Sequence, residues 1–185
     1  MDFIFRKTRR FWNVPGHTHF LTYACKQRLP LLTQDRRRRW VIEAFESTRS
    51  SMNLAILAYV IMPEHVHVLI RLLNPESEME NIVPSLKRSV SVAVKEELQA
   101  RNATRWIQRL TVEYPTKRVF QFWQPGGGYD ENLDDHEDIG NVVRYIHWNP
   151  VRRGLVQSPT DWEWSIARFW EGWAGVPIRM DNPWE

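Results

Sequence analysis

Cysteine is almost absent from this 185-residue chain, and so is any long apolar run. The single cysteine, Cys25, excludes a disulfide bond within the chain and is typical of proteins from a reducing compartment. The longest apolar run, residues 54–62, is far shorter than the roughly 20 residues of a membrane-spanning helix. The N-terminal residues also lack the apolar stretch and cleavage site of a signal peptide. We therefore expect a cytoplasmic protein without a membrane segment.

Acidic residues are scarce near the N-terminus, where residues 1–40 contain ten Lys and Arg but only two Asp. Residues 130–138 have the opposite bias, with six acids and no Lys or Arg, and the net charge of the whole chain is only +3. A basic segment favours a polyanionic partner, because each phosphate that it neutralises releases counterions. The alternative is a solvated helix face, which is the commoner origin of a single charge run.

The apolar periodicity predicts a single α+β domain. In chain order we expect a strand at 17–26, a helix at 36–52 capped by Thr33, strands at 54–62 and 65–73 around a Pro63-Glu64 turn, a helix at 79–98, a strand at 119–124, and a helix from about 134 to 148 that ends before Pro150. This order is the ferredoxin-like (RRM-like) βαββαβ arrangement with an added C-terminal helix.

The same pattern predicts how the rest of the chain is organised. Residues 1–15 form a basic N-terminal arm, residues 16–150 the main domain, and residues 151–185 a Trp-rich tail that packs on the domain or reaches a ligand. Residues 101–118 are basic and irregular, which predicts a surface loop or short extra elements.

His65 and His67 lie two residues apart within an apolar strand. Alternate residues of a strand face the same side, so both imidazoles project together and can share one metal ion. The same spacing occurs in His17 and His19, which have no obvious third partner. A structural pair is therefore at least as common as a metal-binding pair, and the spacing alone does not decide between them.

Tyr145 and Asn149 are four residues apart on the last predicted helix, and they therefore share one helix face. Asn149 offers a neutral amide oxygen suited to Mg²⁺ or Mn²⁺, and two histidines tolerate Mn²⁺ and other transition ions. Tyr145 would then be placed to attack a phosphate, provided that a metal ion or nearby cation favours its phenolate. The ordinary alternative is a half-buried tyrosine with Asn149 as a helix C-cap.

Three segments together resemble a known family. The stretches YVIMPEHVHVLI, FWQPGGGYDENL and YIHWNPVRRGLVQSPTDWEWS, in this order and spacing, closely resemble the REP-associated tyrosine transposases, which are single-tyrosine members of the H-U-H nuclease group. The resemblance runs from about residue 16 to about residue 169. Ile166 departs from it, because the family usually has a small residue there, and this concerns only the tail.

The resemblance implies a metal-dependent enzyme that cleaves and rejoins single-stranded DNA near hairpins formed by palindromic repeats. By position, Tyr145 is the nucleophile that forms a 5′-phosphotyrosine, and the metal ligands for Mg²⁺ or Mn²⁺ are His65, His67 and Asn149. Glu64 is given only a supporting role behind the ligands. The sequence leaves both a monomer and a homodimer open.

Basic and aromatic residues outside this set are candidates for contacts to DNA. They are Arg6, Lys7, Arg9, Arg10, Arg144, Arg152, Arg153, Trp123 and Gln124.

Three rival functions remain. A non-catalytic RRM-like module, or a transposase retired to a host role, would bind single-stranded nucleic acid without cleaving it. The RRM-like module expects exposed aromatics on the middle strands, whereas the retired transposase would usually have lost a catalytic residue. A zinc hydrolase built on the two histidines would need a third acidic or histidine ligand.

Overall fold

The computed structural model describes residues 17–74, 78–133, 135–174, 176–178 and 180–181. The predicted N-terminal arm, with Arg6, Lys7, Arg9 and Arg10, lies outside the described residues. The elements are β1 (Thr18–Ala24), η1 (Lys26–Arg28), α1 (Asp35–Met52), β2 (Leu54–Ile61), β3 (His65–Leu72), α2 (Met79–Ala100), α3 (Thr104–Leu110), β4 (Thr111–Tyr114), β5 (Lys117–Phe120), β6 (Tyr129–Leu133), α4 (His136–Arg152), η2 (Pro159–Asp161) and α5 (Ala167–Trp170).

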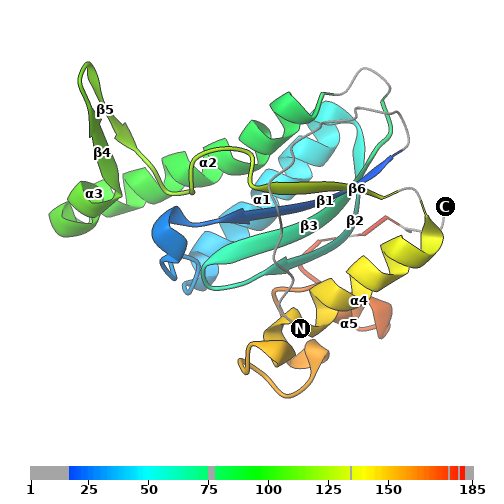
Figure 1. Ribbon diagram of the computed structural model, residues 1–185. Coiled ribbons are helices and arrows are strands. Elements are labelled where there is room, and N and C mark those ends of the chain that lie inside the picture. The colour runs from blue at the N-terminus through cyan, green and yellow to red at the C-terminus, as the bar shows by residue number, and fades with distance from the viewer. Residues whose placement is uncertain (1–16, 75–77, 134, 175, 179, 182–185) are drawn as a thin grey trace.

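A four-stranded antiparallel sheet lies at the centre of the molecule, with the strand order β2-β3-β1-β6. Helices α1 and α2 cover one face of the sheet, and α4 crosses the other face (Figure 1). β2 and β3 are buried along nearly their whole length, because helices cover both of their faces. The mixed α+β architecture predicted from the sequence is confirmed, and among the described residues no helix is both long and apolar enough to cross a membrane.

The β2–β3 hairpin brings the two histidines to a fixed place in the sheet. The turn at Pro63 and Glu64 is closed by the backbone of Met62, which donates a hydrogen bond to the carbonyl oxygen of His65 at 2.8 Å. β1 pairs with β3 so that Thr22 lies opposite His67. The register of these strands therefore decides which side chains surround the histidine pair.

The prediction that residues 119–124 form the fourth strand of the sheet was wrong. Residues 119–124 do not join the central sheet, because β5 ends at Phe120 and pairs only with β4. The buried residues that made this segment strand-like, Phe122 and Trp123, pack in the core, and Trp123 forms only an isolated bridge to Cys25. The fourth strand is β6, whose polar sequence suits a sheet edge with water on one side.

Two predicted helix boundaries were also wrong. The hydroxyl of Thr33 donates to the carbonyl oxygen of Pro30, and α1 begins at Asp35 after Gln34, so Thr33 is not the cap. Helix α4 continues through Pro150 to Arg152. Pro150 and Ile146 are both buried, and the packing of this helix face outweighs the local preference against helix before proline.

For residues 101–118 the sequence predicted either a surface loop or short extra elements, and the structure has the short elements. Helix α3 leads into a two-stranded ribbon of β4 and β5, which projects away from the body of the molecule (Figure 1). Beyond α4, part of the tail packs back on the sheet, where Trp164 and Ile178 are buried and Ser165 forms a bridge to Val60.

Candidate active site

The imidazoles of His65 and His67 lie side by side on the face of the sheet that α4 covers. Their Nε2 atoms are only 3.0 Å apart, and both residues are almost completely buried. Strand geometry explains this placement, because residues i and i+2 of β3 point to the same face.

The remaining nitrogen of each imidazole has a hydrogen-bond partner. The Nδ1 atom of His65 lies 3.1 Å from Glu64 Oε1, and the Nδ1 atom of His67 lies 2.7 Å from Thr22 Oγ1. A carboxylate only accepts, so the Nδ1 of His65 carries its proton and Nε2 keeps a lone pair. If the His67 Nδ1 likewise donates to Thr22, two lone pairs face each other at 3.0 Å, an arrangement that a shared cation would stabilise.

Asn149 completes the group from helix α4. The Nδ2 atom of its side-chain amide lies 3.2 Å from the Nε2 atom of His67, and the residue is 6% exposed. Its Oδ1 atom is buried and has no hydrogen-bond partner among the described residues. A buried amide oxygen without a partner is costly, and a bound cation would satisfy it.

These three side chains fit a divalent metal ion. Two ligand atoms about 2.1 Å from one ion and at right angles to each other would be about 3.0 Å apart, which is the separation of the two Nε2 atoms. Two imidazoles and a neutral amide oxygen suit Mn²⁺ and tolerate Mg²⁺. Among the described residues no cluster of three or more His, Cys, Asp or Glu side chains could hold a metal, so the acidic or third histidine ligand that a zinc hydrolase needs is not found there.

Tyr145 lies one helical turn before Asn149, at the edge of the same group. The centroid of its ring is 5.3 Å from that of His67 and 5.9 Å from that of Phe20, and both contacts are edge-on. The guanidinium of Arg152 lies over the Tyr145 ring at 4.0 Å, and its Nη2 donates to the Tyr145 carbonyl oxygen at 2.9 Å. With 36% of its surface exposed, Tyr145 is open to a large substrate.

A cavity of about 390 Å³ contains all of these groups. Its lining consists of Phe20, Thr22, Arg28, His65, His67, Tyr129, Tyr145, Asn149, Arg152 and Arg153. The cavity thus has an apolar wall, three cationic side chains and a cluster of neutral metal-donor atoms, which is a combination suited to a phosphodiester.

Burial keeps the histidine pair neutral. It lowers the pKa of His65 to about 4, although the carboxylate of Glu64 opposes this change. Burial also holds the pKa of His67 well below its usual value, and the neighbouring His65 and Arg152 lower it further. Neutral imidazole is the form that binds a metal ion, so the site is ready for one near neutral pH.

The predicted DNA contacts fall in different places. Arg152 and Arg153 line the cavity, and Arg153 also forms an ion pair with Glu64 at 2.9 Å. Arg144 is exposed on α4, outside the cavity, and its guanidinium donates to the amide oxygen of Asn141.

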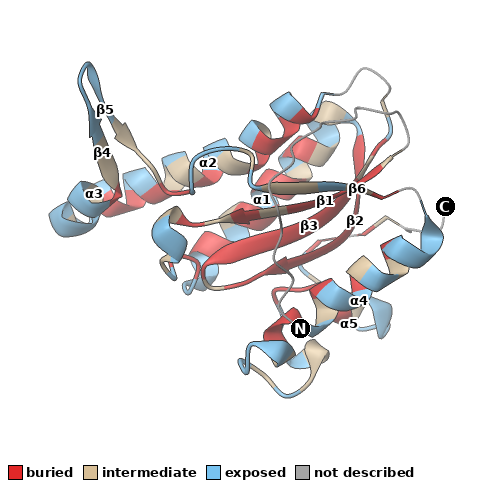
Figure 2. Ribbon diagram, in the orientation of Figure 1, coloured by how far each residue is buried: buried red, intermediate tan, exposed pale blue. Residues whose placement is uncertain are grey.

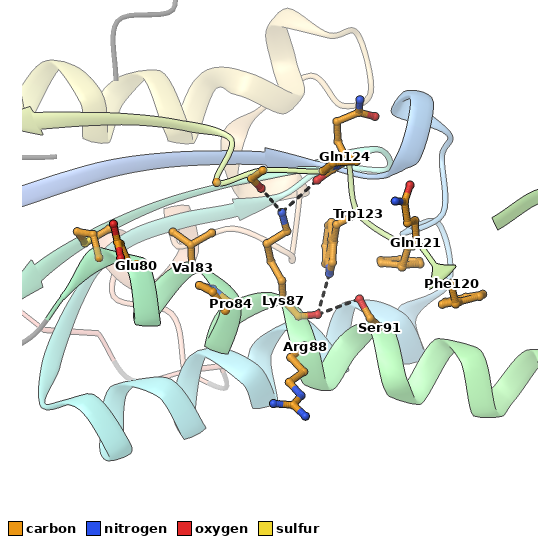
Figure 3. A pocket seen from close by; sticks show the side chains of 15 residues that line it. Glu80, Val83, Pro84, Lys87, Arg88, Ser91, Phe120, Gln121, Trp123 and Gln124 are labelled. Atoms are coloured by element: carbon orange, nitrogen blue, oxygen red, sulfur yellow. Dashed lines mark hydrogen bonds between the residues drawn. The ribbon is translucent and has the colours of Figure 1, made fainter. Parts of the chain in front are cut away.

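Trp123 and Gln124 lie away from the histidines, in a second groove between α2 and residues 120–127 (Figure 3). The indole nitrogen of Trp123 donates to the Lys87 carbonyl oxygen at 2.9 Å, and the residue is buried. Gln124 is exposed, and its side-chain oxygen accepts from the backbone of Gln27 at 3.0 Å. Trp123 therefore packs at the end of its segment, whereas Gln124 is accessible.

The sequence interpretation missed several residues of this cavity. Thr22 and Phe20 reach it only through the pairing of β1 with β3, and Tyr129 through the pairing of β6 with β1. Arg28 belongs to the short helix η1 after β1. No local motif marks these positions, because strand register brings them together.

The other histidines have separate environments. The Nδ1 atom of the fully buried His19 lies 3.0 Å from Asp130 at the sheet edge, far along β1 from the pair. His147 does not line the cavity, and burial lowers its pKa to about 4. Tyr59, on the second strand, is 1% exposed and cannot stack on a base, which counts against an RRM-like module.

Comparison with known proteins identifies a family for this chain. The family model described as "Transposase IS200 like" matches residues 14–149. A Haemophilus influenzae protein described as "Putative REP-associated tyrosine transposase" is 23% identical over 163 residues, which cover 80% of this chain and 86% of that protein. A solved REP-associated tyrosine transposase bound to a REP hairpin has a TM-score of 0.68 at 21% identity and covers 96% of this chain and 93% of its own. At that identity, the structural likeness supports the fold.

Proposed function

Because this chain belongs to the IS200-like transposase family, we propose that it cleaves and rejoins single-stranded DNA through a covalent link to Tyr145. One observation carries the proposal: Tyr145 and Asn149 of α4 lie against His65 and His67 of β3, with the Asn149 amide 3.2 Å from His67. A non-catalytic binding protein has no need of a tyrosine beside a metal-donor set.

His65, His67 and Asn149 would hold a Mg²⁺ or Mn²⁺ ion through the two Nε2 atoms and Oδ1. When bound, such an ion polarises the scissile phosphate and stabilises the leaving oxygen. Arg28 and Arg152 supply positive charge on the cavity wall for the other phosphate oxygens.

Tyr145 acts as the nucleophile. Its phenolic oxygen loses its proton and attacks phosphorus, forming a 5′-phosphotyrosine, while the bond from phosphorus to the 3′ oxygen breaks and that oxygen takes up a proton. The ester stores the energy of the broken bond, so a free 3′-OH can attack it and release Tyr145 without ATP. Arg152, stacked on the ring, orients the phenol towards the cavity.

The substrate that we propose is single-stranded DNA that folds into hairpins at palindromic repeats. The solved relative bound to a REP hairpin supports this choice. The three arginines of the cavity fit a polyanion of this kind.

Covalent capture tests the proposal. The protein is incubated with Mn²⁺ and a library of labelled DNA hairpins whose single-stranded flanks are randomised, and adducts are separated under denaturing conditions. We expect a labelled adduct with the native protein and none with Tyr145→Phe. Tyr129→Phe is the matched control, because Tyr129 lines the same cavity and its adduct should persist. No adduct with the native protein, or an undiminished adduct with Tyr145→Phe, would exclude the mechanism.

A further inference from the structure

The insertion arm, residues 101–121, is not needed to build the sheet. It consists of α3, β4 and β5 and lies between α2 and β6 in the chain, and its two strands form a sheet of their own. Figure 2 shows the ribbon as largely exposed where it projects from the body of the molecule. Within α3, β4 and β5 only Leu110 is buried. An exposed two-stranded ribbon contributes little to the stability of the fold. A role in binding is therefore a better explanation for the arm than a role in folding.

The arm has a strong excess of positive charge for its length. It has five Lys and Arg residues, namely Arg101, Arg105, Arg109, Lys117 and Arg118, against one acid, Glu113. Its net charge is thus +4, compared with +3 for the entire chain, which leaves −1 for all other residues together. Arg105 and Lys117 are exposed, and the part of the chain that the structure describes places no acidic partner within ion-pair distance of either side chain.

The arm is held in a defined position. Two hydrogen bonds within the arm order its root: the Leu110 carbonyl oxygen accepts from the backbone of Gln121 at 2.7 Å, and the Thr111 hydroxyl donates to the Ile107 carbonyl oxygen at 2.7 Å. Farther out, the Gln121 amide donates to the Tyr114 hydroxyl at 3.0 Å. The cationic side chains are therefore presented on an ordered scaffold, which reduces the entropy lost on binding.

The root of the arm is tied to the turn that lines the catalytic cavity. The Lys26 ammonium donates to the carbonyl oxygen of Arg109 at 2.8 Å, and the backbone of Gln27 donates to the side chain of Gln124 at 3.0 Å. The next residue, Arg28, lines the cavity that contains the histidines. On the other side of the root, Lys87 donates to the carbonyl oxygens of Gln124 and Gly126 (Figure 3). DNA leaving the cavity past Arg28 would reach the arm next.

We propose that the insertion arm binds the phosphates of the double-stranded stem of a DNA hairpin while the adjoining single strand occupies the catalytic cavity. This inference rests on the proposed function, because it takes hairpin DNA as the substrate. β4 and β5 have four residues each, so the ribbon extends by about 13 Å, enough to span several phosphates of a duplex. A two-stranded ribbon is also of a size that the major groove admits.

A duplex suits the arm better than a single strand does. A single-strand site needs aromatic rings with open faces, on which bases stack. The most exposed rings of the arm, Trp106 and Tyr114, are 41% and 45% exposed. However, the Arg109 guanidinium lies over Trp106 at 5.4 Å, and the Tyr114 hydroxyl is tied to Gln121. The accessible groups of the arm are therefore its cationic side chains, and a duplex presents a higher density of phosphates to them than a single strand does.

The test measures equilibrium binding in EDTA, which prevents cleavage. Two labelled DNA probes are used: a hairpin with single-stranded flanks, and an oligonucleotide of equal length without self-complementarity. Arg105→Gln and Lys117→Gln are prepared singly and together, and circular dichroism verifies that each variant is folded. Arg39→Gln is the matched control, because Arg39 is exposed on α1 and has no ion pair among the described residues.

We expect each arm substitution to reduce the slope of log K against log salt by about 0.9 on the hairpin, with the double variant losing about twice as much. The single-stranded probe and the Arg39→Gln variant should show no such change. Unchanged slopes on the hairpin, an equal change on the single strand, or an equal loss with Arg39→Gln would each overturn the proposal. The covalent-capture assay is read independently, so a missing adduct would count against Tyr145 catalysis and not against the arm.

Discussion

Contacts behind the proposed metal ligands decide how well their donor atoms are placed. Thr22 and Glu64 each bind the Nδ1 atom of one histidine and so fix the ring that presents Nε2 to the cavity. Outer contacts of this kind raise metal affinity because they select the tautomer and prevent the ring from turning.

Thr22→Val is expected to lower the affinity for Mn²⁺ by about tenfold, since the valine keeps the shape of threonine but removes the partner of His67 Nδ1. Calorimetric titration with Mn²⁺ measures the change. Thr48→Val is the control, because Thr48 also loses a 2.9 Å hydrogen bond, to Ser85, but lies between α1 and α2. Equal affinities for the native and Thr22→Val proteins would show that this hydroxyl does not position His67.

Arg152 is expected to orient the nucleophile, because its guanidinium lies over the Tyr145 ring at 4.0 Å. Losing a stacked cation worth about 1 kcal/mol or more should slow adduct formation by about tenfold in Arg152→Met. Arg152→Lys should be intermediate, since lysine keeps the charge without the planar stack. Single-turnover capture at saturating DNA measures the rate, and a native rate in Arg152→Met would contradict this role.

Sequence spacing predicted the inner residues of the candidate site better than the outer ones. His65 with His67, and Tyr145 with Asn149, are related by the periods of a strand and a helix, so each pair can be inferred from local geometry. Thr22 lies 45 residues from His67 and reaches it only through strand register, which no local pattern specifies.

At the scale of whole elements, burial pattern explains both the success and the failure of prediction. β2 and β3 are continuous apolar runs, and they form where they were expected. β6 is polar and half-exposed because it is a sheet edge. The apolar pattern of residues 119–124, just before it, therefore predicted the fourth strand there instead. Pro150 also misled the prediction, because α4 continues past it to Arg152 with Pro150 buried among the inner residues of the helix.

The start of β6 depends on one glycine. Gly128 has a φ of +82°, and a Cβ atom there would lie only 2.1 Å from the Thr22 carbonyl oxygen. Gly128→Ala should therefore push β6 away from β1 and disturb Thr22, destabilising the fold by about 2 kcal/mol or more. Urea unfolding measures this loss, and the Mn²⁺ titration measures the effect on the site.

Gly154→Ala provides the comparison for Gly128. Gly154 also has a positive φ, of +66°, but nothing lies within 4 Å of its Cβ position. The Gly154→Ala variant should lose only about 1 kcal/mol of unfolding free energy, because of backbone strain, and should keep its Mn²⁺ affinity. If both alanine variants lose the same stability, close approach to Thr22 is not what restricts Gly128.

For the molecule as a whole, buried histidines make stability depend on pH. Burial lowers the pKa of His65 and of His147 to about 4, below the 6.5 of an exposed histidine. Below pH 6.5 the unfolded chain therefore binds protons that the folded chain does not, and stability is lost as the pH falls from 6.5 towards 4. In EDTA each of these histidines should contribute a loss of up to about 2 kcal/mol between pH 6.5 and pH 5.

Urea unfolding at several pH values can distinguish the contribution of His147 to stability from that of the His65 and His67 pair and of metal binding. His147 lies outside the cavity, so His147→Leu should remove its share of the pH dependence: the difference in unfolding free energy between variant and native protein should be constant around pH 8 and should shift in favour of the variant as the pH falls from 6.5 towards 4. Mn²⁺ should stabilise the native protein at pH 7.5. Because burial keeps His65 and His67 neutral in the folded protein until the pH approaches 4, this gain should persist at pH 5 and be lost only near pH 4 and below. Urea unfolding with Mn²⁺ and with EDTA at each pH gives both curves. A gain from Mn²⁺ that is already lost at pH 5 would mean that the ion binds through groups that take up protons at a higher pH than the buried histidine pair.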